Sequence, residues 1–273
     1  MIADLITSSA NPLVKRMRLL AERRHRRREG AFVVQGIQPV WQAVEAGADI
    51  ETLIVAPGLL GRSSARGIAE MVAAQEAAGV RVARLSDELF GRISDREGPP
   101  GLAAIVRGRV TMLGELPAGP RSVFLALHEV GNPGNLGTII RTANAAGAGG
   151  VLLVGHTTDP FDPVAVKASM GALFSLPVAQ AREAGEFFAW AAGRGVTVIT
   201  SAAGAAADFW AASYPRPLAL LLGAEGAGLP EEVLARGDAA VRIPMVGTAE
   251  SLNLAVAAGL LLYEAMRQAG DLS

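Results

Sequence analysis

The stretch IPMVGTAESLNLAVAAGLLLYE, residues 243–264, decides how the second half of this chain folds. It begins as the end of an apolar strand, closed by a proline, and continues through a polar loop. Ser251 and Asn253 then open a helix, and the apolar residues that follow recur at the spacing of a buried helix face. Ser251 is a common type of capping residue, whereas an asparagine in the first turn competes with helical backbone hydrogen bonds. We therefore expect another group to use the amide of Asn253.

The sequence before this stretch has the pattern of a larger α/β domain, residues 122–273. The apolar runs SVFLALH, GVLLVG, VTVIT, PLALLLGAE and AAVRIPM alternate with helical segments. Near-continuous apolar strands are typical of a parallel sheet covered on both faces. Residues 108–121 carry three glycines and two prolines without a clear period, so we interpret them as a linker.

Residues 1–107 show a second alternation of short apolar runs and helical segments, which predicts a small α/β domain. Two domains agree with a length of 273 residues, because single cores rarely grow beyond about 250 residues. No apolar run approaches the roughly 20 residues that a bilayer requires, and the first residues do not read as a secretory signal. We expect a cytoplasmic protein with no membrane contact.

The amino-acid composition limits the kinds of catalytic and metal sites that the chain can form. The chain has no cysteine, which excludes disulfides and thiolate catalysis, and its three scattered histidines make a poor ligand set, so no metal is expected. The formal net charge is -1, yet residues 1–30 hold eight cationic and three acidic residues, a local net charge of +5. A basic helix of this kind is a candidate phosphate-contacting surface, and a solvated helix face is the alternative. The candidate RNA-binding residues are Arg23, Arg24, Arg26, Arg27 and Arg28.

A glycine-rich turn follows the strand that ends at His128 and leads into a helix, in the segment EVGNPGNLGTIIRTANAAGAGG. Such a turn presents backbone N–H groups to an anion. The glycine spacing is G-x-x-G-x-x-G rather than G-x-G-x-x-G, and no acidic residue ends the next strand, so nicotinamide dinucleotide binding is disfavoured. Asn135 and Arg141 lie in this segment; an ordinary cap and a surface arginine are the alternative interpretation.

The segment LALLLGAEGAGLP, residues 218–230, takes an apolar strand into a turn that holds Glu225 among glycines. In open parallel sheets, ligands bind at the carboxyl ends of the strands. An ordinary tight turn with a solvated carboxylate is the alternative for this segment alone.

Together, NLGTIIRTANAAG, LLLGAEGAGLP and IPMVGTAESLNLAVA resemble, in this order, the three motifs of the SpoU (TrmH) branch of the SPOUT RNA methyltransferases, over residues 122–267. The resemblance implies transfer of a methyl group from S-adenosylmethionine to a ribose 2′-hydroxyl of RNA. It also implies an α/β SPOUT domain with a parallel sheet and a deep trefoil knot, an exception to the rule against knots. A homodimer through the knotted domain belongs to the same expectation.

The resemblance further implies the site residues. The catalytic positions are Asn135, Arg141, Glu225, Ser251 and Asn253. The cofactor-binding positions are Thr200, Ser201, Leu222, Gly223, Glu225, Ile243, Met245, Ser251 and Leu252. A guanidinium is a poor base, its pKa being above about 12, so we expect Arg141 to bind the target phosphate and to shift the acidity of the hydroxyl electrostatically. Ala255 departs from the family, many members of which carry a serine there.

The N-terminal segment VVQGIQPVWQAVEAGADIETLIVA resembles the small L30e-like substrate-binding domain attached to ribosomal RNA methyltransferases of this family. This resemblance favours ribosomal RNA, specifically 23S, as the substrate. A transfer-RNA 2′-O-methyltransferase and a catalytically silent RNA-binding protein of the same fold are the alternatives.

Overall fold

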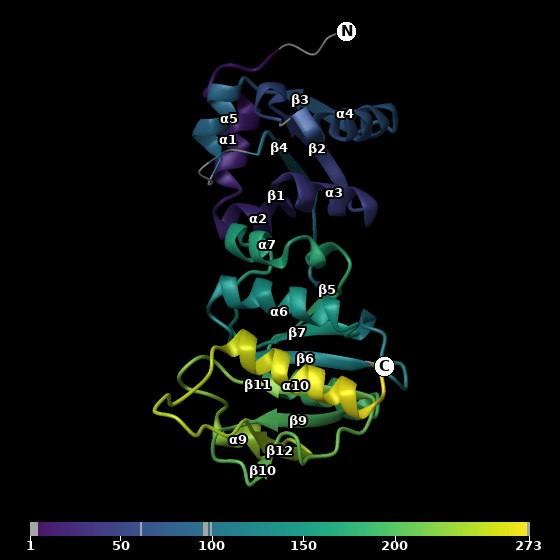
Figure 1. Cartoon of the computed structure of the whole chain (residues 1–273), viewed down its shortest axis with the longest axis vertical. Helices are drawn as coiled ribbons and strands as arrows, with labels where there is room; N and C mark the ends of the chain where they lie inside the picture. Colours follow the sequence, from purple (N-terminus) through teal and green to yellow (C-terminus); the bar gives the residue numbers. More distant parts are fainter. Residues whose placement is uncertain (1–4, 61, 95–97, 99, 272–273) are drawn as a thin grey trace. The chain divides into compact units, whose positions relative to one another are not determined.

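The computed structural model describes residues 5–60, 62–94, 98 and 100–271 (Figure 1). The chain divides into two compact units. Unit 1 comprises Met1–Arg109 and Phe161–Phe174, and unit 2 comprises Val110–Pro160 and Ser175–Ser273. Within the described ranges, every helix is too short or too polar to cross a membrane.

Unit 1 is built on a four-stranded mixed sheet in the order β1-β4-β2-β3. The central strand β4 runs antiparallel to both of its neighbours, and β2 pairs parallel with β3. The strands are β1 (Ala31–Gln35), β2 (Ile50–Val55), β3 (Arg81–Arg84) and β4 (Leu102–Arg107). This is the small α/β fold that the sequence of residues 1–107 predicts.

Helices pack on both faces of the unit 1 sheet, and each face has its own apolar core. The first helix begins at the Asn11-Pro12 pair, because the Asn11 side chain accepts a hydrogen bond from the backbone N–H of Leu13 at 2.9 Å. The helices are α1 (Pro12–Leu19), α2 (Arg23–Glu29), α3 (Ile37–Glu45), α4 (Arg62–Ala77), α5 (Asp87–Ile93) and α7 (Pro163–Ser169), with 3₁₀ turns at Pro57–Leu59 and Ala172–Phe174.

The segment Phe161–Phe174, which contains α7, belongs to unit 1 although it follows the first two long strands of unit 2 in the chain. Its anchors are aromatic. Phe161 stacks on Phe32 with 4.6 Å between ring centroids, Phe174 stacks on the same ring at 6.2 Å, and Val166 is buried in the same core. The bounds of the two units therefore differ from a simple division near residue 107.

Unit 2 contains an eight-stranded sheet in the order β10-β12-β9-β11-β6-β7-β8-β5, and every pairing in it is parallel. The apolar strands β6, β7 and β11 are buried at every residue, as expected for a parallel sheet covered on both faces. The strands are β5 (Thr111–Met112), β6 (Val123–His128), β7 (Gly150–Val154), β8 (Val178–Ala181), β9 (Thr197–Ser201), β10 (Ala207–Asp208), β11 (Leu218–Leu222) and β12 (Ala239–Arg242).

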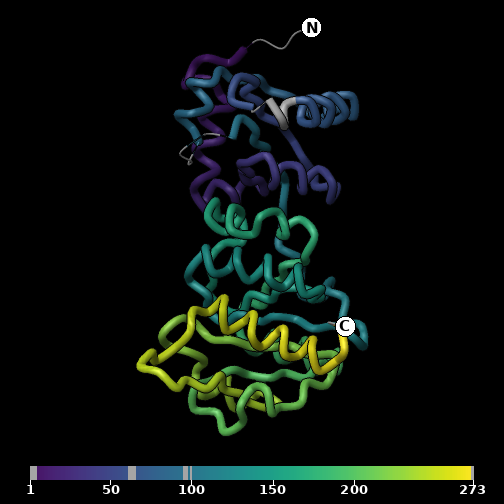
Figure 2. Tube along the Cα trace, viewed as in Figure 1, coloured from purple at the N-terminus to yellow at the C-terminus, as the bar shows by residue number. Residues whose placement is uncertain are grey.

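The two faces of this sheet carry different helices. Helix α8 (Ala184–Gly193) covers the face to which Phe124 points, and Trp190 meets that ring edge-on at 5.3 Å. Helices α6 (Pro133–Ala145) and α10 (Leu254–Gln268) lie side by side on the other face, α6 over β7 and α10 over β11 and β6 (Figures 1 and 2). A short helix α9 (Glu231–Leu234) lies between β11 and β12 in the chain.

The stretch 108–121, expected to be a linker, is mostly part of unit 2. Thr111 and Met112 form strand β5 against β8, and Leu113 and Leu116 are buried in the core beneath α8. The strand pairing and the two buried leucines together attach this segment to unit 2.

Candidate functional site

Three of the predicted cofactor segments meet at one edge of the unit 2 sheet. Strands β12, β9 and β11 are consecutive in the sheet and parallel, so their carboxyl ends lie at the same edge. Ser201 ends β9, Gly223 follows β11, and Ile243 follows β12. Segments about 20 to 40 residues apart in the chain are thus brought to the position where parallel sheets bind ligands.

Gly223 occupies a position that no other residue could fill without moving the backbone. A Cβ atom built there would lie 2.0 Å from the carbonyl carbon of Gly228 and 2.3 Å from the nitrogen of Leu229. The loop folds back so tightly because the Gly228 N–H donates to the Ala224 carbonyl at 2.9 Å. Glu225 is exposed at the tip of this turn. The loop after β11 therefore offers mainly backbone to a ligand.

The side chains of Thr200 and Leu222 point into the protein. Thr200 is fully buried, and its hydroxyl donates to the carbonyl of Ala239 at 3.2 Å. Leu222 is 2% exposed. Only the backbone of these two residues could face a cofactor, whereas Ser251 and Met245 expose their side chains.

Asn253 joins α10 to α6. Its Oδ1 accepts hydrogen bonds from the N–H groups of Ala255 at 2.9 Å and Val256 at 3.4 Å, and its Nδ2 donates to Asn135 Oδ1 at 3.0 Å. The expectation that another group uses this amide is confirmed. The helix start, however, was wrong: Asn253 is itself the N-cap of α10, and Ser251 lies outside the helix.

Helix α6 is capped by Asn132, a residue that the sequence analysis missed. Its Oδ1 accepts from the N–H groups of Gly134 at 2.8 Å and Asn135 at 3.2 Å. The Asn132-Pro133 pair repeats the signal of Asn11-Pro12, so it could have been found. The cap holds the first turn of α6 where Asn135 meets Asn253.

Arg141 lies on the exposed surface of α6, six residues after Asn135. Among the described residues, its guanidinium forms no ion pair and no hydrogen bond with Glu225 or Ser251. Of the five predicted catalytic residues, the structure therefore brings Asn135 and Asn253 into direct contact and leaves the Arg141 side chain open to a substrate.

Glu129, directly after β6, is a second residue that we did not predict, and no sequence pattern marks it. It adopts a φ of 53°, in the left-handed region that side chains rarely occupy, and its N–H donates to the carbonyl of Val154 at 2.9 Å. Strained backbone of this kind is often held at functional sites, and this one lies at the start of the turn that leads to α6.

In unit 1, the prediction for one basic residue of α2 was wrong. Arg26 is 3% exposed, and its Nη1 donates to the carbonyls of Leu20 at 3.2 Å and Ala21 at 2.6 Å. Asp162 lies 3.5 Å from its Nη2. Arg26 satisfies the carbonyls left open at the end of α1 and is not available to an RNA phosphate.

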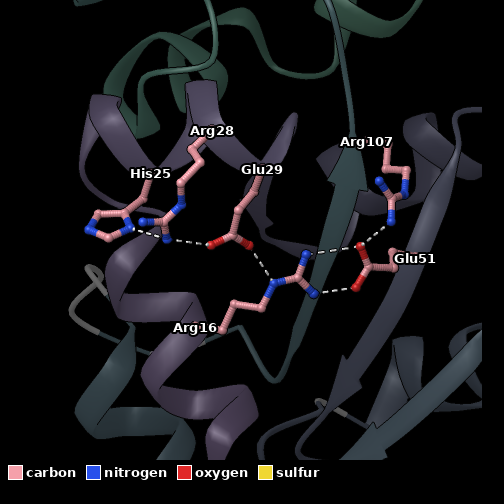
Figure 3. A network of polar contacts seen from close by, with 6 residues as sticks. All are labelled: Arg16, His25, Arg28, Glu29, Glu51 and Arg107. Carbon is pink, nitrogen blue, oxygen red and sulfur yellow. Dashed lines mark hydrogen bonds and ion pairs between the residues drawn. The ribbon is translucent and has the colours of Figure 1, made fainter.

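Other cations of this region belong to the network in Figure 3. Arg16 donates to both oxygens of Glu51 and, through Nε, to Glu29 at 2.8 Å. These hydrogen bonds hold the pKa of both carboxyl groups below the usual range and raise the pKa of Arg16. Arg28 lies 2.8 Å from His25 Nδ1 and 3.4 Å from Glu29, yet its side chain is 65% exposed.

The remaining arginines of α2 face outward. Arg24 is 77% exposed and pairs with Glu22 at 2.8 Å, and Arg23 and Arg27 are exposed. The basic surface of α2 is therefore Arg23, Arg24, Arg27 and Arg28. No group of three or more acidic or histidine side chains within the described residues is arranged to hold a metal ion.

The chain thus combines a parallel α/β unit, whose loops meet at the carboxyl edge of the sheet, with a smaller α/β unit that carries a basic surface. The SpoU rRNA Methylase family matches residues 122–263, and the MRM3-like substrate binding domain matches residues 11–104. The chain belongs to the SpoU rRNA methylase family.

Similar proteins cover nearly the whole chain. A 23S rRNA (uridine(2479)-2′-O)-methyltransferase of Streptomyces viridochromogenes is 34% identical over 92% of this chain and 87% of its own length. A 23S rRNA (guanosine(2553)-2′-O)-methyltransferase of Bacillus subtilis is 30% identical over 94% and 97%. The crystal structure of an AdoMet-bound rRNA methyltransferase from Sinorhizobium meliloti superposes with a TM-score of 0.89 and 36% identity, covering 97% of this chain and 98% of that one.

Proposed function

We propose that this protein methylates a ribose 2′-hydroxyl of 23S ribosomal RNA, with S-adenosylmethionine as the methyl donor. The observation that carries the proposal is the similarity, over both units, to two enzymes named for this reaction on 23S RNA. Those two are named for different nucleotides, so the reaction is the shared property and the target nucleotide is specific to each protein.

The residues at the carboxyl edge fit S-adenosylmethionine, which supplies a methyl group activated by a positive sulfur. Gly223 has no side chain, so its backbone in the tight turn can be approached closely. The side chains of Thr200 and Leu222 are buried, so these residues offer only main-chain groups. A cofactor held here would be recognised by the backbone after β9, β11 and β12. Ser251 and Leu252, which precede α10, would complete this wall.

The chain's own residues then position and polarise the ribose. We assign Arg141 to the phosphate next to the target, where its charge stabilises the developing alkoxide as the hydroxyl proton passes to water. The ribose oxygen bonds to the methyl carbon while the carbon–sulfur bond breaks. Asn135 and Asn253 fix α6 against α10, and Glu225 and Ser251 orient the groups at the edge, so that catalysis is mostly positioning.

The C-terminal segment supports two further expectations, a trefoil knot and a homodimer. The chain leaves β12, crosses the carboxyl edge and enters α10, which packs over β11 and β6; Figure 2 shows this crossing as an extended loop. On α10, Val256, Leu260 and Tyr263 are 52%, 40% and 41% exposed and recur at helical spacing. We propose that a second copy of the chain covers this apolar stripe.

We also propose that the enzyme works in the cytoplasm, where its RNA is found.

An Arg141→Ala variant tests the assigned chemistry. With in-vitro-transcribed 23S RNA and methyl-labelled S-adenosylmethionine, we expect its kcat to fall at least a hundredfold, because electrostatic stabilisation contributes on the order of 2.7–4 kcal/mol per group. Arg66→Ala is the control, since Arg66 is 92% exposed on α4 of unit 1. Near-normal turnover by the Arg141 variant would refute the role.

A further inference from the structure

Unit 1 contains a cavity of about 430 Å³ that the methylation site does not use. All of its lining residues belong to unit 1, and they come from the end of α1, from β1, from α5 and from α7. A volume of several hundred cubic ångströms is in the range of pockets that take a small organic group.

The cavity has a cationic lining. Arg18, Arg92 and Lys167 line it, and no carboxylate does. Arg92 also pairs with Glu88 at 2.7 Å, but Arg18 and Lys167 have no ion pair anywhere in the described part of the chain. Two unpaired cations and one shared cation around a single hollow favour an anionic ligand.

The rest of the lining is apolar, with one weakly held amide. Met17, Leu20 and Val166 are buried side chains that form apolar wall. Gln35 donates from Nε2 to the Ile93 carbonyl at 3.5 Å, the limit for a hydrogen bond, and its buried Oε1 has no partner within the described structure. Because so little holds this amide, it can turn to pair with a ligand at little cost.

We propose that this cavity receives one unpaired nucleotide of the RNA substrate, with the base against the apolar wall and the adjoining phosphates on Arg18, Arg92 and Lys167. Proteins recognise RNA largely through unstacked bases, which they stack on aromatic side chains or guanidinium planes or enclose between apolar side chains, and which they read through hydrogen bonds. A purely apolar ligand would leave the cations unused, and a free inorganic anion would leave the apolar wall unused. The proposal rests on the proposed function, because it takes RNA as the substrate.

Helix α7 gives the cavity a connection to the catalytic unit along the chain. It supplies Lys167 and Val166 to the lining, and in sequence it lies between β7 and β8, within the segment 122–263 that matches the methylase family. The wall of the cavity is therefore made partly by the methylase segment and partly by the substrate-binding segment 11–104. Neither segment alone would form this cavity.

Two kinds of variant test the proposal in the full-length protein. Arg18→Gln combined with Lys167→Gln removes two charges from the lining, and Ala21→Trp adds a bulky side chain to the lining without changing charge, since Ala21 is an exposed lining residue. The matched control is Lys15→Gln combined with Arg66→Gln, which removes two exposed charges outside the cavity. Thermal melts establish that each variant is folded.

Filter binding with protein-free 23S RNA transcript gives the main readout. We expect both kinds of variant to weaken RNA binding at least tenfold, and the charge variant to lower the salt slope by about 1.4, at about 0.7 per single-strand phosphate contact. S-adenosylmethionine affinity, measured by calorimetry, should remain unchanged. The methyl NMR signal of Met17, which lines the cavity, should shift when RNA binds to the wild-type protein and not to Ala21→Trp.

The outcomes separate this proposal from the proposed function. RNA binding within twofold of wild type in both kinds of variant overturns the cavity proposal, whether or not the wild-type protein methylates RNA. Weakened binding in the variants, together with a wild-type protein that transfers no methyl group, sustains the cavity and overturns the proposed function. An equal loss in the control pair also overturns the cavity proposal, because it would show a general charge effect.

Discussion

For the hydrogen bond between Asn253 and Asn135 in unit 2, the structure predicts how much stability is lost when the bond is removed. Asn253→Ala removes the N-cap of α10, with its bonds at 2.9 and 3.4 Å, and also the 3.0 Å bond to α6. Asn135→Ala removes only the 3.0 Å hydrogen bond between the two asparagine side chains. The double variant loses nothing more than Asn253→Ala does.

The magnitudes follow from these contacts. Loss of an asparagine N-cap costs about 1 kcal/mol, and a side-chain hydrogen bond is worth about 0.5–1.5 kcal/mol. Because Asn253 is exposed, we take the lower half of that range. Asn253→Ala should therefore destabilise the protein by about 1.5–2 kcal/mol. Asn135→Ala should cost less, because alanine is the better helix former at that position.

A double-mutant cycle isolates the bond, since the cap and the helix propensity cancel in it. We expect a coupling energy of about 0.5–1 kcal/mol from urea unfolding of the cofactor-free protein. Both single variants should remain folded and lose at least tenfold in methyl transfer, because α6 carries Arg141. A coupling energy below about 0.3 kcal/mol, within the scatter of independent sites, would refute the claim that this pair fixes α6 against α10.

Three further predictions concern the turn at Gly223, the ionic network and α2. Gly223→Ala should lower S-adenosylmethionine affinity at least tenfold by calorimetry and destabilise the protein by about 1–3 kcal/mol, because its Cβ would overlap the backbone of Gly228. Glu51→Gln should cost about 1 kcal/mol at pH 7 by urea unfolding. The stability of the Glu51→Gln protein should also fall less steeply on acidification than that of the wild type. In the folded wild-type protein the pKa of Glu51 is lowered from its usual value of 4.5, so its ionised form stabilises the fold above that pH. This contribution is lost as the pH falls and Glu51 is protonated. Arg26→Gln should destabilise the protein by about 2–3 kcal/mol in thermal or urea unfolding, because it removes the donor to the buried carbonyl of Leu20 and the partly buried carbonyl of Ala21.

Each of these has its own control and its own contrary result. Gly193→Ala is matched to Gly223→Ala, because a Cβ there meets nothing within 4 Å; equal affinities in the two variants would contradict the account of the turn. A Glu51→Gln protein as steeply acid-sensitive as the wild type would rule out the network as the source of that sensitivity. Arg27→Gln should leave stability within about 0.5 kcal/mol and weaken RNA binding, whereas the reverse pattern would restore Arg26 as the RNA contact.

The sequence predicts five of the eight strands of the unit 2 sheet, because an all-buried parallel strand leaves a clear apolar run, and it misses the short strands β5, β8 and β10. The family resemblance implies which loops meet, and the shared carboxyl edge of the parallel strands explains why they do. The sequence does not predict that Phe161 and Phe174 stack on Phe32, because a contact between residues more than 120 positions apart leaves no local pattern. Nothing in the run RRHRRR distinguishes the buried Arg26 from its exposed neighbours.

The position of a labelled methyl group in RNA tests the central claim most directly. Protein-free 23S RNA is incubated with the protein and methyl-labelled S-adenosylmethionine, and the product is hydrolysed with alkali, which cannot cleave next to a 2′-O-methylated ribose. The account predicts that the label is recovered in an alkali-stable dinucleotide. Label recovered only in mononucleotides, as from a methylated base, or no transfer to the RNA at all, would contradict it.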